Sequence, residues 1–168
     1  MLSIRRATKH DASAVTVIYN HAVEDGVATC DLSVIAEANR ASWIESLATP
    51  FGVFVAEADS DVVGWVALMP YDQKACFART ATFATYVSRT SRGMGVGTFL
   101  REHMLLIART ESFHSLVNRV WANNVASIAL AEKFGFTRVG EMKELVYVDG
   151  EYIDCIFFQH MLHREEHR

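Results

Sequence analysis

Prolines, cysteines and long apolar runs are all scarce in this sequence of 168 residues. With only two prolines, its composition is typical of a globular protein and excludes collagen-like and disordered chains. The three cysteines, Cys30, Cys76 and Cys155, are odd in number and far apart, so we expect neither a disulfide framework nor a metal site. No apolar stretch is long enough to span a bilayer, and residues 1–10 lack the apolar core of a signal peptide. These absences predict a cytoplasmic protein with no membrane partner.

Charge of either sign is modest. The chain has 16 basic and 20 acidic residues, for a formal net charge of -4, and no run of Lys or Arg stands out. We therefore expect no nucleic-acid partner. Apolar residues make up 51% of the chain, which is enough at this length to bury a sizeable core. No linker or internal repeat interrupts residues 1–168, so we predict a single domain.

Periodicity in the apolar residues predicts a mixed α/β fold, with a sheet flanked by helices. We expect frayed, charged residues at 161–168. The turn at Asp149-Gly150 is a strong hairpin signal. The predicted elements are a strand at 2–5, helices at 11–23 and 32–47, a hairpin of 53–57 and 62–69, a strand at 80–87, a helix at 93–109, a strand at 115–122, a helix at 126–134 and a hairpin of 136–147 and 152–162.

A glycine-rich turn, Arg92-Gly93-Met94-Gly95-Val96-Gly97, joins the strand at 80–87 to the following helix. Unpaired N–H groups and the helix dipole at such a point form a site for a pyrophosphate, and Arg89 adds positive charge. A dinucleotide-binding turn would follow the first strand of the fold, whereas this turn follows several earlier strands. A phosphate-binding Walker loop would carry a Lys after its last glycine, and this turn has none. A plain flexible turn remains the alternative to a cofactor site.

Four segments together resemble the GNAT acetyltransferase superfamily, and in detail its phosphinothricin acetyltransferase branch. They are Ile4-Arg5-x-Ala7-Thr8-x-x-Asp11, Tyr19-Asn20-His21-Ala22-Val23, the turn at 92–97, and the run from Asn124 to Phe136. The resemblance extends from Ile4 to about Gln159. It implies a mostly antiparallel sheet that splays open beside its fourth strand, with acetyl-CoA in the cleft, and a homodimer in which the last strands form a plausible interface.

The resemblance also assigns the cofactor contacts. Backbone groups on the fourth strand are implied to pair with the pantetheine arm, and the turn is implied to hold the pyrophosphate. The residues implied to contact acetyl-CoA are Thr85, Tyr86, Val87, Arg92, Gly93, Met94, Gly95, Val96, Gly97, Thr98 and Asn124.

The sequence departs from the branch at the positions of acid–base chemistry. A Glu-His pair on the fourth strand is replaced here by Thr82 and Phe83, and Ala131 stands where a His or Tyr is common. One explanation is that other groups act in direct acetyl transfer to a small amine or amino-acid-like acceptor. A second is that the acceptor is an amine other than phosphinothricin, which is deprotonated through ordered water. The third is a catalytically weak or inactive module that still binds acetyl-CoA. The catalytic candidates are Thr82, Tyr86 and Glu24, with His21 and Glu144 as further possibilities.

Overall fold

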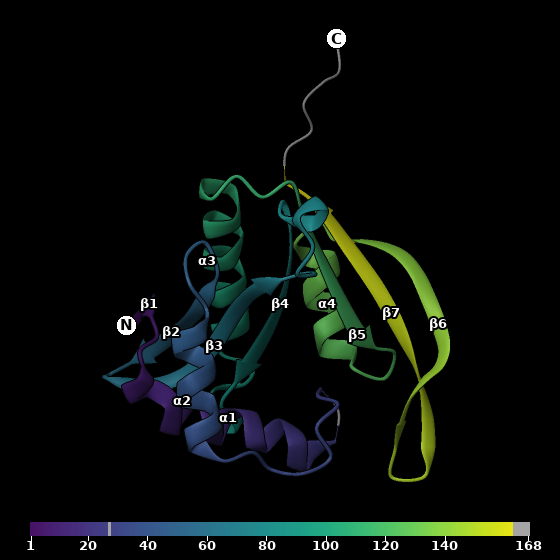
Figure 1. Ribbon diagram of the computed structural model, residues 1–168. Coiled ribbons are helices and arrows are strands. Elements are labelled where there is room, and N and C mark those ends of the chain that lie inside the picture. Colours follow the sequence, from purple (N-terminus) through teal and green to yellow (C-terminus); the bar gives the residue numbers. More distant parts are fainter. Residues whose placement is uncertain (27, 163–168) are drawn as a thin grey trace.

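The computed structural model describes residues 1–26 and 28–162, and these residues form one seven-stranded sheet in the order β1-β2-β3-β4-β5-β7-β6 (Figure 1). Only β4 and β5 pair in parallel, and all other neighbours are antiparallel. The strands are β1 (Leu2–Arg6), β2 (Gly52–Ala58), β3 (Asp61–Pro70), β4 (Thr80–Val87), β5 (Ser115–Trp121), β6 (Thr137–Val148) and β7 (Glu151–Met161). The helices are α1 (Ala12–Asp25), α2 (Glu37–Ser46), α3 (Val96–Thr110) and α4 (Val125–Lys133).

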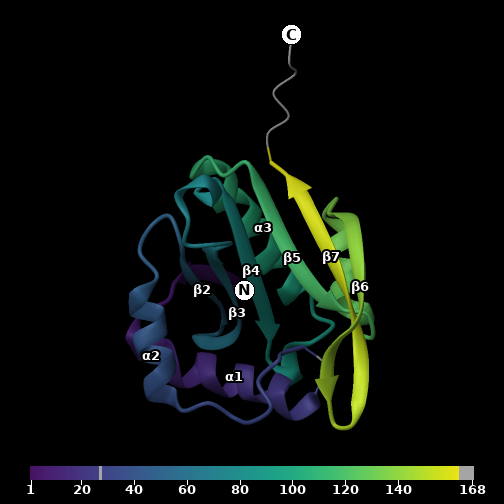
Figure 2. The ribbon, with the colours of Figure 1, turned by 45° about the vertical axis from the view of Figure 1, so that its right-hand side comes forward.

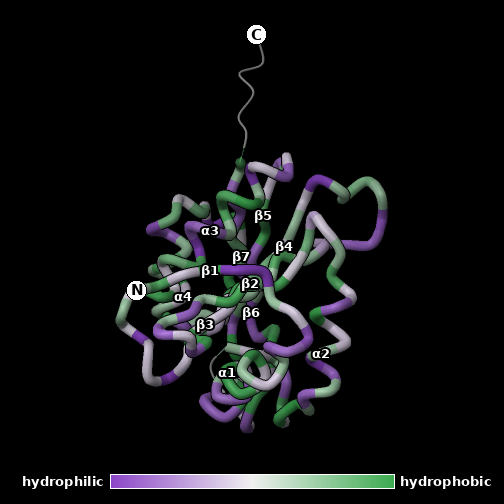
Figure 3. The backbone as a smooth tube through the Cα atoms, turned by 90° about the vertical axis from the view of Figure 1, so that its left-hand side faces the viewer, coloured by the Kyte–Doolittle hydropathy of each residue, from purple (hydrophilic) through white to green (hydrophobic). Residues whose placement is uncertain are grey.

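Helices cover both faces of the sheet, which divides the buried side chains into two clusters (Figure 2). Alternate residues of β2 show the division, because Phe54 faces the cluster that contains α3 and α4, while Val53 and Val55 face α1 and α2. Figure 3 shows the resulting hydropathy, with hydrophobic positions concentrated on the central strands. We call the two sides of the sheet the α3 face and the α1 face.

Most predicted elements are confirmed, and the strand predicted at 80–87 has the same bounds as β4. The second helix was predicted to begin at Leu32 but begins at Glu37, since Leu32 and Val34 are 74% and 58% exposed and have no apolar surface to cover. The helix predicted from Gly93 begins at Val96, because Gly93 and Gly95 take positive φ angles that a helix excludes. Of the predicted tail, residues 163–168 lie outside the described residues.

The closing hairpin is the most exposed part of the sheet. Asp149 and Gly150 form its turn with φ angles of 51° and 87°, as predicted for this pair. Among the described residues, strand β6 pairs only with β7, and most of its side chains are exposed. The hairpin therefore leaves a long, partly apolar surface at the edge of the sheet.

Candidate functional site

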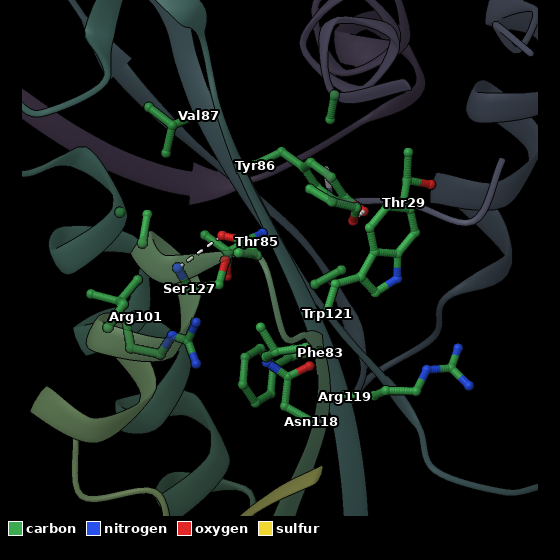
Figure 4. Close-up of a pocket in the computed structure, with 18 of the residues that line it drawn as sticks. Thr29, Phe83, Thr85, Tyr86, Val87, Arg101, Asn118, Arg119, Trp121 and Ser127 are labelled. Atoms are coloured by element: carbon green, nitrogen blue, oxygen red, sulfur yellow. Dashed lines mark hydrogen bonds between the residues drawn. The ribbon is translucent and has the colours of Figure 1, made fainter. Parts of the chain in front are cut away.

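A large cavity of about 930 Å³ opens where β4 and β5 separate. The two strands pair only from Thr80 to Thr82 and from Ser115 to Val117, and the next residues on each strand, Phe83 and Asn118, already line the cavity (Figure 4). Because the strands diverge beyond this point, their backbone groups have no partner across the gap. The residues that line the cavity come from α1, the segment at 28–31, β4, the glycine turn, α3, β5 and α4.

Strand β4 sends its side chains alternately to the two faces of the sheet. Phe83 and Val87 pack in the cluster under α3, so Thr85 between them points the same way. Tyr86 packs in the cluster under α1, and Thr82 shares its side of the strand. All five residues line the cavity, which is therefore open to both faces through the gap beside β4.

The glycine turn forms the outer end of this cavity. Gly93 and Gly95 have φ angles of 77° and 83°, and a Cβ at either position would meet no atom within 4 Å. The backbone of the turn is therefore accessible, and Gly95 is the N-cap of α3, so the unpaired N–H groups of the first helical turn face the same space. This arrangement suits a phosphate group. Five of the predicted contacts in the turn and first helical turn line the cavity: Arg92, Gly93, Gly95, Val96 and Gly97.

Two other predicted contacts, Met94 and Thr98, are not among the residues that line the cavity. The Met94 side chain is 71% exposed, and the Thr98 hydroxyl accepts a hydrogen bond from the Lys133 ammonium at 3.4 Å.

Two arginines beside the turn are held by the end of α1. Arg92 donates to Asp25 at 2.8 Å, and Arg89 donates to Asp25 at 2.6 Å and lies 3.0 Å from Glu24. The hydrogen bonds from Arg89 and then Arg92 lower the pKa of Asp25. Both Arg92 and Asp25 line the cavity. The ion pairs hold both arginines beside the glycine turn, with Arg92 at the mouth of the cavity.

Asn124 lines the cavity and is also the N-cap of α4. Its Oδ1 accepts a hydrogen bond from the Ser127 N–H at 3.0 Å, which Figure 4 shows as a dashed line from Ser127. This cap satisfies one of the otherwise unpaired N–H groups of the helix. The side chain implied to contact the cofactor thus has a structural role that the sequence comparison did not predict.

The α1 side of the cavity carries a polar network. The Tyr19 hydroxyl donates to Asp31 at 2.5 Å and lies 2.5 Å from the Thr29 hydroxyl. Burial, followed by the hydrogen bond to Asp31, raises the pKa of Tyr19. The Tyr86 hydroxyl donates to the carbonyl oxygen of Ala28 at 3.2 Å, and burial raises the pKa of Tyr86 as well. Both phenols therefore stay protonated at neutral pH, so either can donate a hydrogen bond but neither can accept a proton.

Of the predicted catalytic candidates, Thr82 and Tyr86 line the cavity and Glu24 does not. The Glu24 side chain is 52% exposed and pairs with Arg89. His21 and Glu144 also lie outside the cavity lining, on α1 and β6. The structure thus brings two of the five candidates together, both on the α1 face.

The lining residues that sequence reasoning missed include Arg101, Asn118, Arg119 and Trp121. Arg101 had a detectable signal, because it lies on the apolar side of α3 at helical spacing from Met104, Leu105 and Ala108, where a charge is unexpected. The residues on β5 had no such signal, since nothing in the sequence shows where this strand leaves its neighbour.

Among the described residues, no helix is long and apolar enough to cross a membrane, and no group of three or more His, Cys, Asp or Glu side chains could hold a metal ion. The group that the cavity does suit is acetyl-CoA. The accessible glycine turn fits its pyrophosphate, and the unpaired edge of β4 fits the amides of an extended arm.

Comparison with known proteins agrees with this geometry. The chain is 30% identical over 167 residues to the L-methionine sulfoximine/L-methionine sulfone acetyltransferase of Salmonella typhimurium, with 99% of this chain and 96% of that protein covered. It is 27% identical over 165 residues to the phosphinothricin N-acetyltransferase of Streptomyces coelicolor, with 96% of each covered.

Solved structures agree as well. The structure of yncA from Salmonella typhimurium, determined with its cofactor acetyl-CoA, has a TM-score of 0.94 and 29% identity, and the match covers 100% of this chain and 98% of that one. The sequence model of the Acetyltransferase (GNAT) family matches residues 15–136. The chain belongs to the GNAT family and is an acetyl-CoA-dependent N-acetyltransferase of that type.

Proposed function

We propose that the protein transfers the acetyl group of acetyl-CoA directly to the amino group of a small, amino-acid-like acceptor. The observation that carries this proposal is that one continuous cavity joins the glycine turn to the α1 face through the gap between β4 and β5. Acetyl-CoA enters on the α3 face and the acceptor on the α1 face, so the amine and the thioester meet in the gap. Positioning of this kind lowers a barrier by about 7–11 kcal/mol in well-oriented reactions.

Each chemical requirement has a candidate group in this chain. Backbone N–H groups of β4 beyond Thr82 have no strand partner on the β5 side and can stabilise a developing oxyanion. Tyr86 and Thr82 lie on the acceptor side, where a hydroxyl can hold a water that receives the proton of the amine. Glu24 has no part in this scheme, because its carboxylate pairs with Arg89 outside the cavity lining.

The acceptor class is supported by a charge on the α1 face. Val120 packs under α3, so Arg119 beside it on β5 points to the opposite face, where it lines the cavity and is exposed (Figure 4). A guanidinium at this place is suited to pair with the carboxylate of an amino acid. The named substrates of the two relatives above, phosphinothricin and methionine sulfoximine, are compounds of that class.

The test is an assay of the purified protein with acetyl-CoA and a panel of amines. The panel contains L-methionine sulfoximine, phosphinothricin, common L-amino acids, the amide of the best acceptor and a peptide with a free N-terminus. Acetylated product is measured by mass spectrometry, because the exposed thiols of Cys30 and Cys76 would react with a thiol reagent. We expect turnover with an amino acid, and Arg119→Met should raise its KM more than that of the amide. Tight acetyl-CoA binding without turnover on any amine would favour the non-catalytic module instead.

We also propose that two copies associate through the β6–β7 hairpin in the cytoplasm, where the three free cysteines stay reduced. The hairpin exposes large apolar side chains that a second copy would cover. They are Val139, Met142, Leu145, Tyr147 and Tyr152. Sedimentation of the purified protein should give the mass of a dimer, and Tyr152→Lys should shift it toward a monomer. A monomer at all concentrations would exclude this interface.

A further inference from the structure

Arg101 is a buried charge inside the cofactor side of the cavity. It lies in the second turn of α3, is 2% exposed, and lines the cavity. Its guanidinium carbon lies 4.3 Å from the centre of the Phe83 ring and 5.5 Å from that of Phe136 (Figure 4). The guanidinium therefore rests on aromatic rings and points toward the gap between β4 and β5.

No group of the described chain neutralises this charge. The Nε and Nη1 atoms of Arg101 are buried and have no hydrogen-bond partner among the described residues. Burial alone lowers the pKa of Arg101 to about 10, which leaves it charged at neutral pH. A buried cation without a counter-charge is costly, and contact with aromatic faces offsets only part of that cost.

The other charged residues that line the cavity do not serve Arg101. They are Asp25, Asp31, Asp72, Arg92 and Arg119. Asp25 is paired with Arg89 and Arg92 at the mouth, and Asp31 accepts the Tyr19 hydroxyl on the α1 face. Asp72 is exposed beyond the end of β3. The negative charge that matches Arg101 is therefore expected to come from a ligand.

The position of Arg101 along the cleft indicates which part of acetyl-CoA would lie beside it. The pyrophosphate site is at the glycine turn, beside the end of β4 at Val87. Phe83 lies four residues earlier on the strand, about 13 Å away, and is the first residue beyond the last β4–β5 pair. An arm that runs along β4 from the turn therefore brings its sulfur end to the inner end of the cleft, where Arg101 lies.

We propose that Arg101 is a catalytic residue that binds the sulfur of CoA in its thiolate form and so stabilises the leaving group. The inference rests on the proposed function. In that reaction the lone pair of the neutral amine forms a C–N bond with the thioester carbon, and the C=O electrons move to oxygen. When the carbonyl reforms, the C–S bond breaks and its electron pair stays on sulfur. The amine proton leaves to water, so the products are the amide, the thiolate and a proton.

This role explains how the reaction proceeds with Ala131 where an acid would otherwise protonate the sulfur. Ala131 is fully buried, and its carbonyl oxygen accepts a hydrogen bond from the Phe136 N–H at 3.0 Å. This bond holds Phe136, whose ring contacts the Arg101 guanidinium, next to Ala131. A fixed positive charge stabilises a thiolate without transferring a proton. An opposite charge within about 4–6 Å favours the ionised form of a group by about 1–3 pKa units.

The test measures the pKa of the CoA thiol in the complex with free CoA, so that it does not depend on turnover. Thiolate absorbance in the ultraviolet is followed against pH, with the desulfo-CoA complex as the blank. We expect the thiol pKa to be about 1–2 units lower in the wild type than in Arg101→Met, with Arg101→Lys between them. The matched control is Arg109→Met, at an exposed position of the same helix outside the cavity lining, which should leave the thiol pKa unchanged.

The melting temperature gives a second readout, because Arg101→Met should raise the stability of the free protein while it lowers the rate of the reaction. Since Arg101→Met removes a desolvated charge, the free protein should melt at a higher temperature than the wild type, while kcat falls about tenfold or more. A purely structural arginine would instead lower the melting temperature and leave the thiol pKa alone, and that result would overturn the inference. The same thiol pKa in both proteins with CoA bound would overturn it and leave the proposed function standing. Failure of CoA to bind the wild type would overturn both.

Discussion

The side chain of Thr85 provides a quantitative test of how the cofactor side of the cavity is built. Its hydroxyl is buried on β4 and has no hydrogen-bond partner among the described residues. A buried hydroxyl without a partner costs about 1–3 kcal/mol. Thr85→Val replaces that oxygen with a methyl group of similar shape, so the free energy of unfolding of the free protein should rise by about 1 kcal/mol. For a chain of this length that corresponds to about 2–4 °C in melting temperature.

Thr80 on the same strand is the matched control. Its hydroxyl lies 3.3 Å from that of Ser115, and Ser115 is only 4% exposed. Thr80→Val therefore breaks a hydrogen bond and leaves a buried hydroxyl unpaired, which should cost about 1 kcal/mol. Chemical denaturation of the two variants should show changes of opposite sign. If Thr85→Val destabilises the protein as much as Thr80→Val does, the Thr85 hydroxyl is already satisfied and the reasoning fails.

Acetyl-CoA should reverse the advantage of Thr85→Val. The hydroxyl lies on the face where the pantetheine arm is expected, and a hydrogen bond to that arm is worth about 0.5–1.5 kcal/mol. Titration calorimetry should therefore show binding about 2–10-fold weaker in Thr85→Val than in the wild type. An unchanged affinity would mean that the arm does not use this hydroxyl.

Four further perturbations test separate parts of the structure. The hydrogen bond from Arg5 lowers the pKa of Asp11 from 3.8 to about 2. The ionised Asp11 therefore adds about 1–2 kcal/mol to the free energy of unfolding above pH 3.8, and this contribution is lost as the pH falls through about 2. Asp11→Asn should flatten that part of the curve of unfolding free energy against pH, measured by chemical denaturation. Asn124→Ala should cost about 1 kcal/mol of unfolding free energy in the free protein through loss of the α4 cap, whereas Asn124→Ser should retain most of it. Gly95→Trp should weaken acetyl-CoA binding at least about tenfold in calorimetry, whereas Met94→Trp, at an exposed position outside the lining, should bind normally. Thr82→Glu should add an ionisation to the pH profile of kcat/KM, and an unchanged profile would show that position 82 does not face the amine.

The elements that the sequence predicts well are those whose local chemistry agrees with their packing. Strand β4 is rich in Thr, Phe, Tyr and Val, and it is central in the sheet, so propensity and burial favour the same conformation. The Asp149-Gly150 turn needs two positive φ angles that these residues adopt readily. The glycine turn shows the limit of periodicity, because Gly93 belongs to the loop although the apolar pattern continues into α3.

The candidate site could be predicted only in part, since it depends on where two strands stop pairing. The glycine turn and the residues of β4 follow from local sequence and resemblance, and most of them line the cavity. Separation of β4 and β5 after Thr82 is a property of the whole sheet, however, and it decides that Asn118 and Trp121 reach the cavity. Arg119 could not be assigned to a face until the strand it occupies had been placed.

The residues at positions 82 and 83 are best understood through the faces that they occupy. Neighbours on a strand point to opposite sides, so Thr82 lies on the α1 face and Phe83 on the α3 face. A histidine at position 83 would place an imidazole about 4 Å from the buried Arg101 guanidinium, and a like charge at that distance would keep the imidazole from accepting a proton. An uncharged aromatic ring is compatible with Arg101, because its face attracts the cation. Phe83 and Arg101 therefore form one unit, in which the aromatic ring supports a buried charge on the α3 face of the cavity.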